Sequence, residues 1–194
     1  MTTKITLLAT ILWLFAACHS PKPSPKPIDL NNRAASMMFS NPDSALLLLN
    51  LAIETDKFFY PACANKIQLF CTLGKYDSAI EANKKAIELK PELPEAYTFL
   101  GMLYDKTGQH ELASDQYRHA IGLFDKNILK KDSTLTENRM NRACALLLSG
   151  NEQEGKKEVG ELLLVDSGNA ALQSLQMFDK DQYLDLFFKK PIGK

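Results

Sequence analysis

The chain has 194 residues, of which 45% are hydrophobic and 24% charged, and its 23 basic and 23 acidic residues cancel to a formal net charge of zero. This length is enough for one domain with a hydrophobic core. A chain without excess positive charge lacks the basic face that supplies most of the affinity for nucleic acid, so we expect no nucleic-acid partner. Only three histidines are present, which leaves little material for many kinds of catalytic site.

The amino terminus has the pattern of an export signal. Lys4 precedes a stretch of 13 uncharged residues, Ile5 to Ala17. This length fits the hydrophobic region of a signal peptide and is too short to cross the ~30 Å of a bilayer as a helix. The stretch ends in Ala16-Ala17-Cys18, which resembles the lipobox of bacterial lipoproteins, although Phe15 stands where that family usually has Leu. The resemblance implies a signal peptide over residues 1–17 and lipid attachment at Cys18, which becomes the first residue after cleavage.

The alternative for this segment is an ordinary signal peptide cleaved after an alanine, with Cys18 as an incidental thiol. The residues that follow favour the lipoprotein, because proline stands at every second position from Pro21 to Pro27. Such a run favours extended polyproline II, at ~3.1 Å per residue. We therefore expect residues 18–27 to be an acylated cysteine followed by a stalk. The localisation predicted is the bacterial cell envelope, lipid-anchored to a membrane, with the outer membrane favoured.

The rest of the chain repeats every 34 residues. Small residues keep this spacing: Ala45, Ala79 and Ala113 form one series, Ala52, Ala86 and Ala120 a second, and Gly74 and Gly108 a third. Gly150 follows Gly108 by 42 positions, which is one repeat with an eight-residue insertion near residues 128–135. We therefore predict four repeats over residues 28–169, at about 28–59, 60–93, 94–135 and 136–169. Capping helices are expected over residues 170–194.

The repeated pattern resembles the tetratricopeptide repeat family. In the third repeat, bulky, small and aromatic residues stand where that family has them: Tyr97, Leu100, Gly101, Tyr104, Gly108, Ala113, Tyr117 and Ala120. The resemblance implies an all-α fold, a right-handed superhelical α-solenoid of about four helical hairpins with a C-terminal capping segment. Arg33, Ile67, Gly155 and Leu162 depart from the family pattern, mostly in the outer repeats. The last aromatic and apolar residues are expected to cover the open end of the solenoid: Phe178, Tyr183, Leu184, Phe187 and Phe188.

In this family the first helix of each hairpin lines a concave surface. Transferring that register gives these candidate partner-binding residues: Gln68, Thr72, Glu95, Thr98, Met102, Asp105, Lys106 and Met140. Chaperone-binding relatives grip a terminal carboxylate with Lys, Arg and Asn, but here the matching positions hold Ala64, Gln68, Phe99, Glu137 and Asn141. We therefore expect an adaptor or scaffold that binds a partner protein or peptide by shape and a few hydrogen bonds. For Met140, contact with the C-terminal cap is an equally good interpretation. No catalytic residue, metal or cofactor is predicted.

The sequence also suggests two other functions. A small-molecule or glycan-binding component of an envelope uptake system would need more inserted sequence than eight residues. A metal-assisted hydrolase would have to use His110 and His119, but their surroundings lack the spacing of a zinc site. Cys63 and Cys71 lie about 12 Å apart on one predicted helix, beyond the ~7 Å that a disulfide tolerates. These two thiols and Cys144 are expected to be buried apolar residues.

Overall fold

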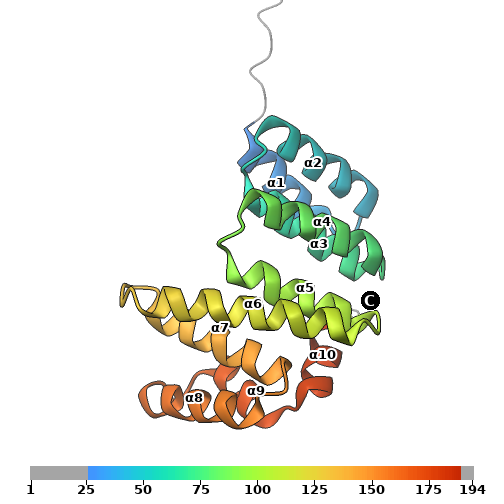
Figure 1. Cartoon of the computed structure of the whole chain (residues 1–194). Coiled ribbons are helices and arrows are strands. Elements are labelled where there is room, and N and C mark those ends of the chain that lie inside the picture. The colour runs from blue at the N-terminus through green and yellow to red at the C-terminus, as the bar shows by residue number, and fades with distance from the viewer. Residues whose placement is uncertain (1–25, 189–194) are drawn as a thin grey trace, which may run out of the picture.

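Residues 26–188 are described in the computed structural model of the protein, and they form ten α-helices and no strand. The helices are α1 (Pro27–Met37), α2 (Pro42–Thr55), α3 (Tyr60–Thr72), α4 (Tyr76–Leu89), α5 (Pro94–Lys106), α6 (His110–Ile128), α7 (Leu135–Leu148), α8 (Glu152–Val165), α9 (Ala170–Met177) and α10 (Lys180–Phe188). The first eight pair as four antiparallel hairpins that stack one on the next (Figure 1). The predicted all-α solenoid is confirmed.

Several predictions fall outside the described residues: the signal peptide of residues 1–17, the lipid attachment at Cys18, the stalk as far as residue 25, and residues 189–194 of the cap. At the stalk's predicted end, helix α1 begins with Pro27 in its first turn. Proline is suited to this place because the first amides of a helix have no partner within the helix. The stalk as predicted therefore overlaps the first helix by one residue.

The turns inside the hairpins are made by glycines with positive φ. Gly74 has a φ of 70°, and its amide donates to the Cys71 carbonyl at 3.0 Å. The next amide, that of Lys75, donates back to the Phe70 carbonyl at 2.8 Å. This paired arrangement satisfies carbonyls at the end of α3, and glycine adopts its backbone conformation at little steric cost. The same pair of bonds recurs after α5 and α7, so the predicted role of the repeated glycines is confirmed.

Small residues let the helices of a hairpin approach closely. Ala79, Ala86, Ala113 and Ala120, two of them on α4 and two on α6, are completely buried. Gly101 on α5 is the tightest case, because a Cβ atom built there would lie 2.5 Å from the ring of a tyrosine on α6. The 34-residue spacing of small residues therefore marks the positions where helices cross.

The eight-residue insertion lengthens the second helix of the third hairpin and its following loop. Helix α6 has 19 residues, whereas its counterpart α4 has 14. Residues 129–134 then form a loop in which Lys131 has a φ of 51°. In Figure 1 this loop projects beyond the ends of the neighbouring hairpins.

The two C-terminal helices, α9 and α10, pack against different parts of the solenoid. Helix α9 packs against α8 and α7 and so covers the end of the stack, as a cap does. Helix α10 instead turns back toward the middle of the solenoid, where Leu184 and Phe188 join the core formed by α3, α4 and α5. The expectation that all of the last apolar residues cover the open end is therefore wrong for these two side chains. It is also wrong for Phe187, whose ring lies 5.5 Å from that of Phe99 on α5. Among the described helices, none has the length and hydrophobicity needed to cross a bilayer.

Candidate partner-binding face

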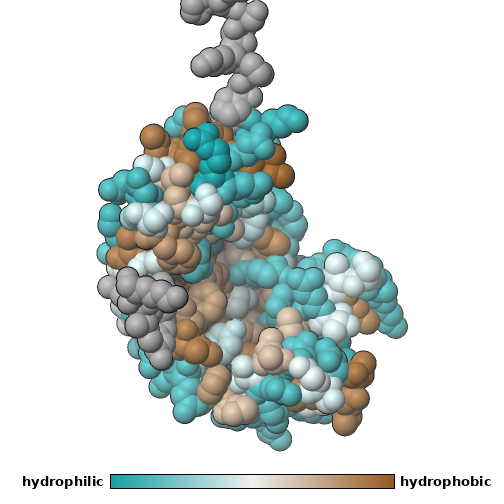
Figure 2. Space-filling view, turned by 180° about the vertical axis from the view of Figure 1, so that it is seen from behind, coloured by the Kyte–Doolittle hydropathy of each residue, from teal (hydrophilic) through white to brown (hydrophobic). Residues whose placement is uncertain are grey.

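The first helices of the hairpins lie on one side of the solenoid. Helices α1 and α3 touch directly, and so do α5 and α7, even though a second helix separates each pair along the chain. Figure 2 looks onto this side and shows a hollow in its middle, with hydrophobic residues gathered beside it. We call this surface, formed by α3, α5 and α7, the inner face. All eight candidate residues predicted from the family register belong to these three helices.

Four of the candidates have side chains that solvent or a partner can reach. Gln68 is exposed on α3, while Thr72 and Thr98 are partly exposed and donate their hydroxyl protons to carbonyls of their own helices. Lys106 at the end of α5 is also accessible. The inner face therefore presents polar groups at the positions where the sequence predicted them.

Glu95 lies in the first turn of α5 and contacts the next hairpin. Its Oε1 accepts a bond of 3.3 Å from the Asn141 amide on α7, which ties the third hairpin to the fourth. Its Oε2 is buried and has no hydrogen-bond partner within residues 26–188. A buried carboxylate oxygen without a donor is costly, and its burial keeps this atom out of reach of a bound molecule in this structure. Burial, and secondly the charge of Glu95, raises the pKa of the nearby Tyr60.

Asp105 is not a surface residue, contrary to the prediction. Its side chain is buried, and its Oδ2 accepts bonds of 2.7 Å from both the Tyr117 hydroxyl and the Lys180 ammonium. His110 Nδ1 lies 2.9 Å from its Oδ1. Burial, followed by the bond to Asp105, raises the pKa of Tyr117, so this hydroxyl stays protonated and keeps donating.

Met102 and Met140 are also packed away from solvent to different degrees. Met102 is buried in the same core as Leu184 and Phe188 of α10, so the chain itself covers this candidate. Met140 is half-buried and packs against the core of α8 and α9, as the alternative of a contact with the cap implies. Met102 is therefore not available to a partner in this structure, and Met140 is available only in part.

The three thiols in the described part of the chain form no disulfide and have low reactivity. Cys63 and Cys71 are buried, and Cys144 is half-buried beside Tyr183. Burial raises the pKa of all three, to about 12 for Cys71 and about 11 for Cys144. Because the thiolate is the reactive form, these cysteines are poor nucleophiles at neutral pH.

His110 and His119, the candidate metal ligands, each contact a side chain of helix α5. His110 is paired with Asp105, and the ring of His119 lies 4.3 Å from that of Tyr97 on the neighbouring helix α5. No group of three or more potential ligands with suitable geometry occurs in residues 26–188. The structure therefore gives each described histidine a contact that involves no metal.

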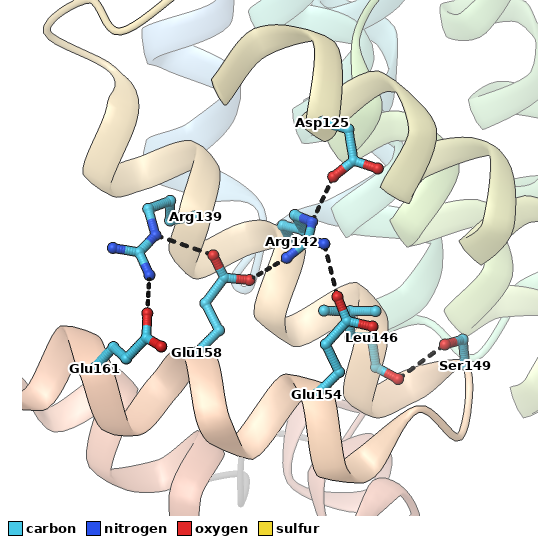
Figure 3. A network of polar contacts seen from close by, with 8 residues as sticks. All are labelled: Asp125, Arg139, Arg142, Leu146, Ser149, Glu154, Glu158 and Glu161. Atoms are coloured by element: carbon cyan, nitrogen blue, oxygen red, sulfur yellow. Dashed lines mark hydrogen bonds and ion pairs between the residues drawn. The ribbon is translucent and has the colours of Figure 1, made fainter. Parts of the chain in front are cut away.

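A charged network outside the inner face joins the third hairpin to the fourth (Figure 3). Its members are Asp125 on α6, Arg139 and Arg142 on α7, and Glu154, Glu158 and Glu161 on α8. Glu158 is buried and lies 2.6 Å from Arg142 and 3.0 Å from Arg139. Burial by itself would lower the pKa of Arg142, but its bonds to Glu158 and Asp125 raise it overall. Sequence reasoning missed this network, because its partners come from three helices with no fixed spacing.

Stacked hairpins with a polar and partly hydrophobic inner face define an α-solenoid of the kind that binds other proteins. Residues 68–108 match the family model described as TPR repeat, and residues 94–127 match the model described as tetratricopeptide repeat. No curated protein matches the sequence.

Solved structures with a similar fold also exist. A crystal structure of MamA is 20% identical, with a TM-score of 0.50 over 75% of this chain and 81% of that one. YrrB, described as a TPR protein with an unusual peptide-binding site, is 19% identical, with a TM-score of 0.49 over 86% and 80% of the two chains. A second MamA structure is 16% identical, with a TM-score of 0.49 over 84% and 87%. At these identities the likeness to the first MamA structure concerns the fold alone.

Proposed function

We propose that this protein is an adaptor of the bacterial cell envelope that binds a protein or peptide partner on its inner face. The observation that carries the proposal is the set of accessible polar side chains on this face, Gln68 on α3 and Thr98 and Lys106 on α5. Such groups can fix the orientation of a bound segment by hydrogen bonds.

Site-specific photo-crosslinking in cells tests this proposal. A photoreactive amino acid is placed at Gln68 or Thr98 on the inner face and, as a matched control, at the exposed Lys85 or Glu88 on α4. We expect a discrete crosslinked protein from the inner-face positions and not from the α4 positions. Identical products from both faces, or no product from any position, would contradict partner binding at this surface.

The membrane anchor is a separate part of the proposal and rests on the lipobox-like sequence at Cys18. Cys18 would carry the lipid after removal of residues 1–17. Replacing Cys18 by Ser is expected to abolish incorporation of labelled palmitate and to release the protein from the membrane fraction. If the unmodified chain takes up no label, the anchor proposal fails, while crosslinking from Gln68 and Thr98 still tests the adaptor.

A further inference from the structure

Helix α10 lies along the inner face and contacts successive hairpins. At its start, the Lys180 ammonium lies 2.7 Å from Asp105 and 5.3 Å from the centre of the Tyr117 ring. At its other end, the Phe188 ring packs edge-on against Tyr76 at 5.6 Å. The chain thus covers part of the surface proposed to bind a partner with its own last described helix.

The contacting side chains of α10 follow a simple spacing. Lys180, Leu184 and Phe188 are four residues apart, which places them along one side of a helix. Leu184 and Phe188 are buried in the core, and Lys180 pairs with the buried carboxylate of Asp105. Leu186, on the opposite side, remains exposed, while Asp185 lies at the flank, 3.9 Å from Lys106 on α5.

The receiving surface matches each of these three groups. The buried Asp105 requires a cation, because an isolated carboxylate in such a place is costly. Met102 and Leu148 belong to the hydrophobic core that takes up Leu184 and Phe188, and the Lys106 ammonium lies 5.7 Å from the centre of the Phe188 ring. This is the arrangement by which grooves bind amphipathic helices, with anchors on one helical side.

We propose that α10 occupies the binding place of a partner helix, and that the partner carries the same pattern: a basic residue, an aliphatic residue four positions later and an aromatic residue four positions after that. This inference rests on the proposed function and names the chemistry of the partner. Helix α10 has only nine residues, and helices of this length are marginally stable alone. A longer amphipathic helix with the same anchors can therefore displace it.

The test uses the full chain and a synthetic probe. The probe is a fluorescein-labelled peptide of residues 178–188, made helical by a hydrocarbon staple between positions 182 and 186, which are exposed in α10. Binding is measured by fluorescence anisotropy to the unmodified chain and to a chain that carries Leu184→Ala and Phe188→Ala. Because these substitutions free the surface, we expect the variant to bind the probe at least tenfold more tightly than the unmodified chain.

Matched controls make the outcome specific. A chain with Leu186→Ala, which removes an exposed side chain of the same helix, is expected to bind the probe as weakly as the unmodified chain. A probe that itself carries Leu184→Ala and Phe188→Ala is expected to lose at least tenfold in affinity for the opened variant. Far-UV circular dichroism and thermal melting verify that the variants are folded. A chain with the single substitution Lys180→Ala is expected to bind the probe with an affinity between those of the unmodified chain and the double variant. This single variant replaces the double variant in the test if the double variant does not fold.

Three results would overturn the inference. The first is equal binding of the probe to the unmodified and opened chains, and the second is no difference between the probe and its control. The third is a concentration-dependent dimer of the unmodified chain that is lost with Phe188→Ala, since the occupant would then be α10 of a second copy. Failure of the peptide test with intact crosslinking from Gln68 would refute this inference and leave the adaptor function standing. Peptide binding without any crosslinked partner would show that this surface takes up such a helix, but it would contradict the adaptor function.

Discussion

Replacing Gly101 by alanine is expected to destabilise the third hairpin. The new Cβ atom would lie 2.5, 2.8 and 2.9 Å from three atoms of the Tyr117 ring, well inside ordinary van der Waals contact. Tyr117 cannot easily move aside, because it is completely buried and its hydroxyl is bonded to Asp105 at 2.7 Å. The clash should therefore shift α5 relative to α6 or break that hydrogen bond.

The size of the effect follows from opposing contributions. Overpacking a core typically costs ~1–3 kcal/mol, and a weakened hydrogen bond to a charged group costs up to ~1.5 kcal/mol more. Alanine in place of glycine within a helix contributes ~1 kcal/mol in the favourable direction. The net loss of unfolding free energy for Gly101→Ala should be about 0–3.5 kcal/mol, with a central value near 2 kcal/mol. For a protein of this size, the central value corresponds to a lowering of Tm by roughly 4–8 °C.

The matched control is Gly122→Ala on α6 of the same hairpin. Gly122 is helical and exposed, and a Cβ atom there would meet nothing within 4 Å. This substitution should stabilise the protein by ~0.5–1 kcal/mol, so the two variants should differ by about 0.5–4.5 kcal/mol, with a central value near 3 kcal/mol, in urea denaturation followed by circular dichroism. Equal stability of the two variants, or a more stable Gly101→Ala, would refute the close approach between α5 and Tyr117.

Three other predictions concern charges and thiols. Asp105→Asn should lower the unfolding free energy by ~2–3 kcal/mol in urea denaturation, because the buried carboxylate accepts charge-assisted bonds; an unchanged midpoint would contradict this. Arg142→Ala should cost ~2–4 kcal/mol, since it removes a partner of the buried Glu158, and its Tm loss should persist in high salt. Cys71 and Cys144 have pKa values raised by burial from 9.0 to about 12 and about 11, so their protons are held more tightly in the folded state. The stability that these thiols contribute should therefore be fully present below pH 9 and be lost between pH 9 and about 12. The loss should be shallower after Cys144→Ala, and a flat profile would contradict the burial of these thiols.

The arrangement of the helices could be predicted well because its signals are local and repeated. Gly74 and Gly108 mark turns whose hydrogen bonds involve residues within five positions. Ala79 and Ala113 mark crossings between helices that are adjacent along the chain. Since each hairpin buries its face only against the next, the spacing of these residues contains most of the information needed for the fold.

The inner face was predicted less completely. The family register placed Gln68, Thr98 and Lys106 on it, and these side chains are accessible in the structure. It also placed Asp105 there, but the structure buries this carboxylate beneath Lys180, which lies 75 positions later in the sequence. A register transferred from repeats describes only contacts between neighbouring hairpins, so it cannot show which surface a later helix covers.

By itself, the sequence determined the periodicity, the hairpin turns and the all-α class, because helix propensity, glycine turns and small residues at crossings act over short distances. Only the tertiary structure decided where α10 lies. Two residues, Phe178 and Asp179, separate it from α9, so its direction depends on which distant groups accept Lys180, Leu184 and Phe188. That choice is a balance of burial and charge pairing across several hairpins, and no local pattern in the chain specifies it.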